Sequence, residues 1–180
     1  KDGSKSSAKV VTGNAEAISA ENWQGKLYSA ANKVNIADYF EENTQYHYQY
    51  TDNYTGDDSV WSAEYDYTTK ATDKFSVILT GDPQVGASGS SSDYSANDAS
   101  VARDAYNWNK TMQQALKTCP DASFLLSAGD QINQSGATKD DDKKTRESEY
   151  AGYLYPSVFR SLLIAATIGN HDMAGLFSTF

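Results

Sequence analysis

The feature that most constrains this fold is a set of three short apolar runs alternating with longer segments. The runs occupy residues 75–80, 123–127 and 162–168. Between the first two, apolar side chains recur at spacings of three and four, at Val101, Ala105, Trp108, Met112 and Leu116. That spacing is the period of one helix face. The sequence therefore predicts two buried strands joined by a helix that ends before Pro120.

A second helix is predicted between the second and third runs, around residues 150–160, with an interruption near Pro156. The charged residues 140–144 before it are expected to form a solvated loop, because no ligand spacing of a calcium loop follows them. Strands that alternate with helices are joined by crossovers and pair in parallel. We therefore expect an α/β domain over residues 73–180.

The chain before residue 73 has a different pattern. Residues 45–50 and 61–67 alternate between aromatic and polar side chains, as half-buried strands do. Turn-forming residues fill the segment 51–59 between them. These segments predict two antiparallel strands of a small all-β module over residues 1–72, with further strands expected at 9–12 and 33–36.

The three apolar runs end alike, in a glycine followed by polar side chains. The polar residues are Asp82 and Gln84 after Gly81, Asp130 after Gly129, and Asn170, His171 and Asp172 after Gly169. In an open parallel sheet, residues just beyond the carboxyl ends of neighbouring strands meet in one crevice. Carboxylates, an amide oxygen and an imidazole there suit divalent metals such as Mn, Mg, Fe or Zn. A carboxylate can bridge two such ions about 3.5–4 Å apart, and the pair then clamps a phosphoryl group and activates water.

The ordered set of these motifs resembles that of the calcineurin-like metallophosphoesterases, and within them the purple acid phosphatase type. In that type a β-sandwich similar to fibronectin type III precedes the catalytic domain, and residues 46–50 and 61–69 resemble its last strands. The resemblance extends from about Val34 to Asp172. It implies a fibronectin type III-like module over residues 1–72 and the first βαβαβ half of a metallophosphoesterase domain over residues 73–180.

The resemblance also implies a dinuclear metal site. Asp82 would bind the first ion, Asp130 would bridge both, and Asn170 would bind the second. Gln84 stands where the family commonly has a histidine, so its amide oxygen is a further candidate ligand.

The same resemblance implies the reaction. His171 would stabilise the transition state or protonate the leaving oxygen, and Asp172 would orient His171. The substrate would be a small-molecule phosphate monoester or diester, hydrolysed by water that two divalent ions activate.

Besides Gln84, two further departures from the family pattern concern the ligands. Asn133 replaces a tyrosine that binds ferric iron in purple acid phosphatases, so neither that ligand nor its colour is expected. The family supplies further histidines from the second half of its domain, whereas this chain contains only His47 and His171. We therefore expect the chain to be a piece of a longer enzyme and to be inactive alone.

Gln84 also keeps a second function class open. This is a secreted or surface binding or adhesion protein whose phosphoesterase-like domain is degenerate and non-catalytic. The tyrosine-rich strands of the first module would then offer a surface contact to carbohydrate.

Composition limits the classes of binding partner and the cellular location that we expect for this chain. The chain has 15 Lys and Arg against 24 Asp and Glu, a net charge of −9, and no basic stripe to bind nucleic-acid phosphates. Its longest apolar run, 161–168, is far shorter than the roughly 20 residues that span a bilayer. Abundant Tyr, Asn, Ser and Asp with a single cysteine suits an extracellular or cell-surface protein of a bacterium.

Overall fold

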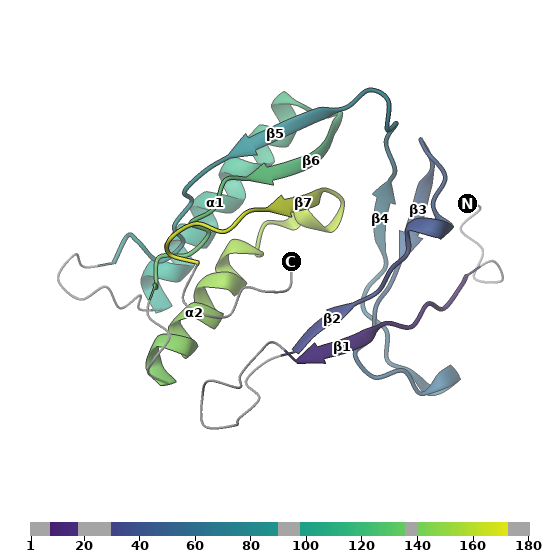
Figure 1. Cartoon of the computed structure of the whole chain (residues 1–180), viewed down its shortest axis with the longest axis horizontal. Helices are drawn as coiled ribbons and strands as arrows, with labels where there is room; N and C mark the ends of the chain where they lie inside the picture. The colour runs from purple at the N-terminus through teal and green to yellow at the C-terminus, as the bar shows by residue number, and fades with distance from the viewer. Residues whose placement is uncertain (1–7, 18–29, 90–97, 136–139, 173–180) are drawn as a thin grey trace.

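A computed structural model describes residues 8–17, 30–89, 98–135 and 140–172 of the chain. These residues form a mixed α/β structure with three separate sheets (Figure 1). The strands are β1 (Asn14–Ala17), β2 (Ala30–Lys33), β3 (Gln45–Tyr48), β4 (Tyr65–Thr68), β5 (Ser76–Thr80), β6 (Ala122–Ser127) and β7 (Leu163–Ala166). The helices are α1 (Asp98–Thr118) and α2 (Asp140–Tyr153), with short 3₁₀ turns η2 (Ala37–Tyr39), η3 (Gly56–Asp58) and η4 (Ser157–Arg160).

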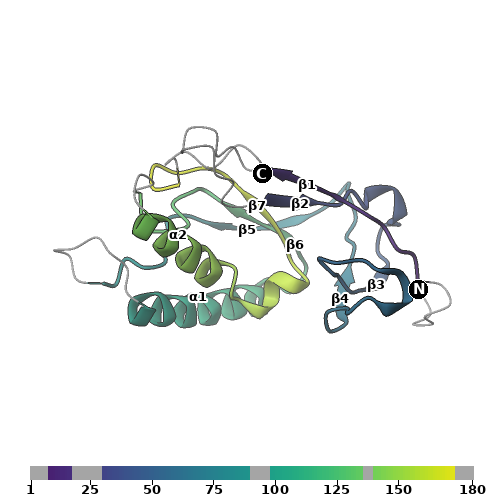
Figure 2. The same cartoon turned by 90° about the horizontal axis from the view of Figure 1, so that it is seen from below.

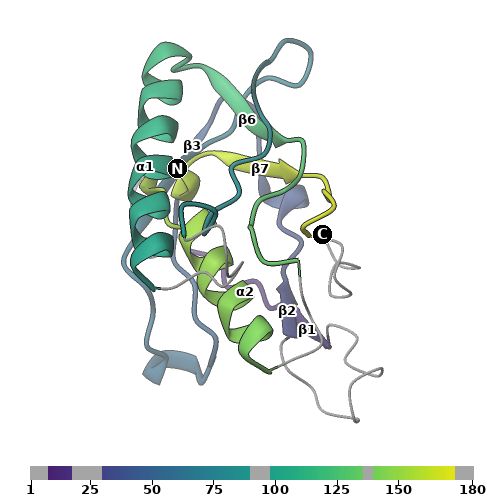
Figure 3. The same cartoon turned by 90° about the vertical axis from the view of Figure 1, so that its left-hand side faces the viewer.

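The expected parallel sheet is confirmed, in the order β5-β6-β7. Helices α1 and α2 lie on the same face of this sheet (Figures 2 and 3). Buried apolar side chains fill the space between the helices and the sheet: Val85, Val101, Trp108, Met112, Ala122, Leu125, Tyr153 and Leu162. The indole Nε1 of Trp108 donates a hydrogen bond of 2.9 Å to the carbonyl of Tyr153, and the two rings stack. This contact joins α1 to the end of α2.

The second helix is displaced from its expected position. It covers Asp140–Tyr153, so residues 140–144 belong to a helix and not to a loop. The expected interruption near Pro156 is confirmed, because α2 ends three residues before Pro156 and η4 follows it. The shift has a physical reason: the buried face of α2 carries the polar residues Arg146 and Glu149, which give no apolar period.

The hairpin of β3 and β4 is also confirmed. The strands pair antiparallel, with Tyr46 opposite Tyr67 and Tyr48 opposite Tyr65. The other two strands expected in this part are misplaced. Residues 9–12 form no strand, and the segment 33–36 shares only Lys33 with β2. Strands β1 and β2 contain no β-branched or aromatic residue, so the sequence gives little signal for them and their antiparallel pairing defines them.

The β3–β4 hairpin contacts the α/β part through η4. The Tyr48 hydroxyl donates a hydrogen bond of 2.7 Å to the carbonyl of Arg160, and the Arg160 guanidinium lies 5.1 Å from the centre of the Tyr65 ring. On the hairpin itself, His47 lies 2.6 Å from the carboxylate of Asp66 on the neighbouring strand.

Among the described helices, none is long and apolar enough to cross a membrane.

Candidate metal centre

The loops that follow β5 and β6 run side by side beyond the sheet. The backbone N–H of Asp82 donates to the carbonyl of Gly129 at 3.1 Å, and that of Gln84 donates to the carbonyl of Asp130 at 2.9 Å. One residue further on, Val85 and Ile132 form a parallel bridge. The first two predicted ligands are therefore held beside the third by backbone hydrogen bonds.

The loop that follows β7 joins from the other side. The carboxylate Oδ1 of Asp130 accepts a hydrogen bond of 2.9 Å from the backbone N–H of His171. Gly129 and Gly169 pass each other so closely that a Cβ on Gly129 would lie 2.5 Å from the Gly169 nitrogen. Side chains at these two positions would push the loops apart. Asp130 therefore lies between the other two loops.

Three of the four predicted metal ligands have an unusual backbone. Asp82, Gln84 and Asp130 have φ angles of 57°, 35° and 49°. A residue with a Cβ reaches this left-handed region at a cost of about 1–2 kcal/mol. Among the described residues, Asn43 is the other non-glycine residue with positive φ. Such backbone strain gathers at functional sites, where neighbouring contacts hold it in place.

The donor set consists of oxygen atoms. Asp82 and Asn170 are exposed, and Gln84 and Asp130 are half-buried. Within the described ranges, no three side chains of His, Cys, Asp or Glu come close enough to hold a metal ion. The predicted donors at this edge of the sheet are the carboxylates of Asp82 and Asp130 and the amide oxygens of Gln84 and Asn170. That set fits a hard cation such as Mn²⁺ or Mg²⁺ better than a softer one.

The ring of His171 is held by a peptide carbonyl. Its Nδ1 lies 2.5 Å from the carbonyl oxygen of Asn133. Because a carbonyl oxygen only accepts, Nδ1 carries the proton, and Nε2 is the nitrogen left for chemistry.

The Asp172 carboxylate forms hydrogen bonds with groups other than the His171 ring, and its role in orienting His171 stays a prediction. The wholly buried Asp172 carboxylate accepts hydrogen bonds from the backbone N–H groups of Gln131 and Gly169, and from the Tyr150 hydroxyl. Its shortest contact, to Gly169, is 2.9 Å. The Asp172 side chain therefore ties the loops after β6 and β7 to α2, while Asn133 takes the partner role at the imidazole.

Two buried charged residues of α2 support the same loops. The Arg146 guanidinium, 2% exposed, donates to the carbonyls of Gln134, His171 and Asp172 at 2.6, 3.2 and 3.3 Å. The Glu149 carboxylate is completely buried, and its Oε2 accepts from the N–H groups of Asn133 and Gln134 at 3.1 and 2.7 Å.

Burial governs the ionisation of this cluster. It raises the pKa of Glu149 to about 7, although the N–H groups of Gln134 and Asn133 and the charge of Arg146 act in the opposite direction. Burial also raises the pKa of the Tyr150 hydroxyl, and the Asp172 charge adds to that effect.

The sequence reading missed Arg146 and Glu149. The one signal was their spacing of three, with Tyr150 and Tyr153 on the same helical face. Polar residues at that spacing are usually solvated, so the pattern alone does not separate a buried cluster from a surface one.

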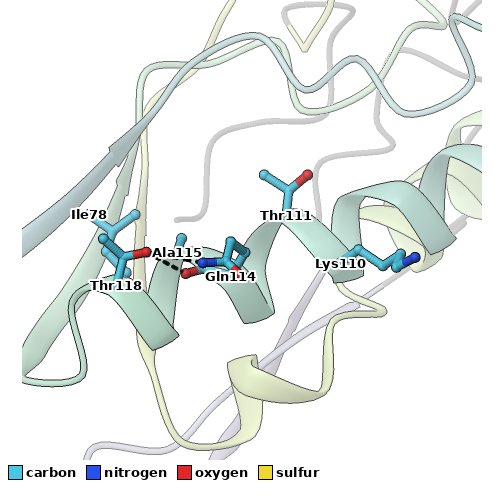
Figure 4. A pocket seen from close by; sticks show the side chains of 6 residues that line it. All are labelled: Ile78, Lys110, Thr111, Gln114, Ala115 and Thr118. Atoms are coloured by element: carbon cyan, nitrogen blue, oxygen red, sulfur yellow. Dashed lines mark hydrogen bonds between the residues drawn. The ribbon is translucent and has the colours of Figure 1, made fainter.

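A groove of about 650 Å³ lies elsewhere, between α1 and β5 (Figure 4). It is lined by Ile78, Lys110, Thr111, Gln114, Ala115 and Thr118. The α1 residues in this set come from the second half of the helix, toward the amino ends of the strands. None of the predicted site residues lines the groove, so it is separate from the candidate metal centre.

Comparison of this chain with protein-family models, with curated proteins and with solved structures finds no match.

Proposed function

We propose that this chain carries the first half of the active site of a dinuclear metallophosphoesterase. The full-length protein would be a calcineurin-like enzyme of the purple acid phosphatase type, extracellular or on the cell surface. Residues 1–72 would form its fibronectin type III-like sandwich and residues 73–180 the first half of its catalytic domain. Its substrates would be phosphate monoesters or diesters.

The observation that carries this proposal is the position of Asp130. Its backbone carbonyl accepts the N–H of Gln84 from one loop, and its side chain accepts the N–H of His171 from the other. The motifs at three strand ends therefore meet at one residue, Asp130, and the left-handed backbone at Asp82, Gln84 and Asp130 supports a role beyond folding.

Different residues of the chain would bind the metal ions and donate the proton. Asp82, Gln84, Asp130 and Asn170 would hold the ions, here Mn²⁺ or Mg²⁺ on the chemistry of the donors, with Fe or Zn as the family's other choices. When bound, such a pair polarises the phosphoryl oxygens and lowers the pKa of water. With Nδ1–H held by the carbonyl of Asn133, His171 would turn Nε2 toward the ester. In its doubly protonated form it would give the Nε2 proton to the leaving alcohol and return to the Nδ1–H form. Asp172 and Arg146 would keep the His171 loop in place.

A binding or adhesion protein with a degenerate domain is the second candidate. It is favoured by the absence, among the described residues, of three His, Cys, Asp or Glu side chains grouped for a metal. The exposed aromatic side chains of Tyr50, Tyr54 and Trp61 would then serve as a contact surface for carbohydrate.

Hydrolysis assays on the full-length protein separate the two. We expect p-nitrophenyl phosphate or its bis ester to be hydrolysed when Mn²⁺ is added. We expect no hydrolysis when a chelator is present. His171→Ala should lower turnover by about 10²–10⁴-fold, the usual effect of removing an acid–base group. His47→Ala, at the exposed second histidine, is the matched control and should retain activity. No turnover of either ester with any divalent metal would overturn the hydrolase and favour the binding protein.

A further inference from the structure

We infer that Glu149 is a positioning residue for His171 and acts through the peptide group that links Asn133 to Gln134. The inference deepens the proposed function and rests on it for the catalytic role of His171. It names a carboxylate from α2 that the motifs at the strand ends do not contain.

One peptide group connects the two side chains. Its carbonyl, from Asn133, lies 2.5 Å from Nδ1 of His171. Its N–H, from Gln134, donates to Oε2 of Glu149 at 2.7 Å. Because a peptide group is planar and rigid, fixing its N–H also fixes the direction of its carbonyl. A carboxylate on the N–H side also polarises the group and makes the carbonyl a stronger acceptor.

Neighbouring contacts hold both ends of this connection. Glu149 Oε2 also accepts the N–H of Asn133, so the same oxygen binds two successive N–H groups. Arg146 donates to the carbonyls of Gln134 and His171, which keeps the two loops at a constant separation. Rotation of the peptide group between Asn133 and Gln134 would break the hydrogen bonds at both its carbonyl and its N–H.

The Glu149 carboxylate is packed closely against the backbone of Gly86. A Cβ added to Gly86 would lie only 2.2 Å from Glu149 Oε1. Oε1 is buried and has no hydrogen-bond partner among the described residues. A buried carboxylate with one unsatisfied oxygen is costly for the fold, and such groups persist where they serve a site.

The other ionisable groups around Glu149 come from three elements. Arg146, Tyr150 and Tyr153 are on α2 itself, and His171 and Asp172 follow β7. Asp104 of α1 contacts the same loop as Glu149, because its carboxylate accepts the N–H of Gly86 at 2.9 Å. None of these groups replaces Glu149 at the Gln134 N–H in the contacts described.

The test is the tautomer of His171, read from the ring nitrogen shifts of the metal-free chain at pH 8. With only two histidines in the sequence, His47 is an internal control in every spectrum. We expect His171 to be in the Nδ1–H form in the wild-type chain. The fraction in that form should fall in Glu149→Gln and fall further in Glu149→Ala, while His47 does not change. Glu147→Ala, at an exposed glutamate of the same helix, should match the wild type.

An unchanged His171 tautomer in folded Glu149→Gln would overturn the inference, and this variant decides the matter if Glu149→Ala does not fold. A change of equal size at His47 would also overturn it. In the full-length enzyme, Glu149→Gln should lower kcat about 10-fold with KM unchanged. If the wild-type full-length protein hydrolyses neither ester, the proposed function is wrong. The tautomer measurement would still decide whether Glu149 positions His171.

Discussion

At the scale of single residues, Glu149 makes the stability of the fold depend on pH. Burial raises its pKa from 4.5 to about 7, so the folded chain binds a proton more tightly than the unfolded chain. The resulting stabilisation is fully present below pH 4.5 and is lost as the pH rises through 7.

We therefore expect the free energy of unfolding of the wild type to fall between pH 5 and pH 8 by about 2–3 kcal/mol more than that of Glu149→Gln. Urea denaturation at the two pH values measures the difference. Glu147→Gln should follow the wild type, since Glu147 is exposed. Parallel pH dependence in wild type and Glu149→Gln would show that Glu149 titrates at its ordinary pKa.

Gly86 provides a second prediction at this scale. Its φ of 105° and its distance from Glu149 both oppose a side chain, whereas Gly56, with φ of 79°, faces open space. Gly56→Ala carries only the backbone strain, of about 1 kcal/mol, and Gly86→Ala adds about 1–3 kcal/mol from crowding. Thermal unfolding of the two variants compares them directly, and equal losses would mean that Glu149 moves aside freely.

At the scale of elements, the strands of the parallel sheet could be predicted and α2 could not. Runs such as 75–80, closed by Gly81 and Asp82, have the composition of buried strands, and their alternation with helical segments predicted that they pair in parallel. Helix α2 buries Arg146 and Glu149, whose burial depends on contacts with loops distant in the chain. Such contacts join residues that are distant in the chain, so the local sequence pattern does not predict them. The hydrogen bond between Asn133 and His171 could not be predicted for the same reason.

The junction of the two helices gives a prediction for Trp108. Trp108→Phe removes the Nε1 donor and leaves the buried carbonyl of Tyr153 unpaired, besides losing part of the ring. We expect a loss of about 2–3 kcal/mol in the free energy of unfolding. Trp61→Phe is the matched control, because Trp61 is 37% exposed, and should cost less than about 0.5 kcal/mol. Similar losses in both variants would contradict the account of the core.

At the scale of the whole molecule, the sheet has two unlike faces. One packs against α1 and α2, and the other exposes Val77, Leu79 and Leu163, with Leu79 70% exposed. The candidate metal centre lies at the carboxyl edge between these faces, where three loops meet. That convergence could be predicted from parallel strands, whereas the left-handed backbone at Asp82, Gln84 and Asp130 could not, since it depends on hydrogen bonds between the loops.

The most direct test of the account is Mn²⁺ binding to this chain, because the central claim is that Asp130 joins three loops into one metal site. Asp130→Asn keeps an oxygen for the His171 N–H and removes the charge that a metal ion needs. Asp121→Asn, at an exposed carboxylate before β6, is the matched control. In a calorimetric titration we predict weak Mn²⁺ binding by the wild type and by Asp121→Asn, and its loss in Asp130→Asn. No binding by the wild type, or equal binding by all three chains, would contradict the claim.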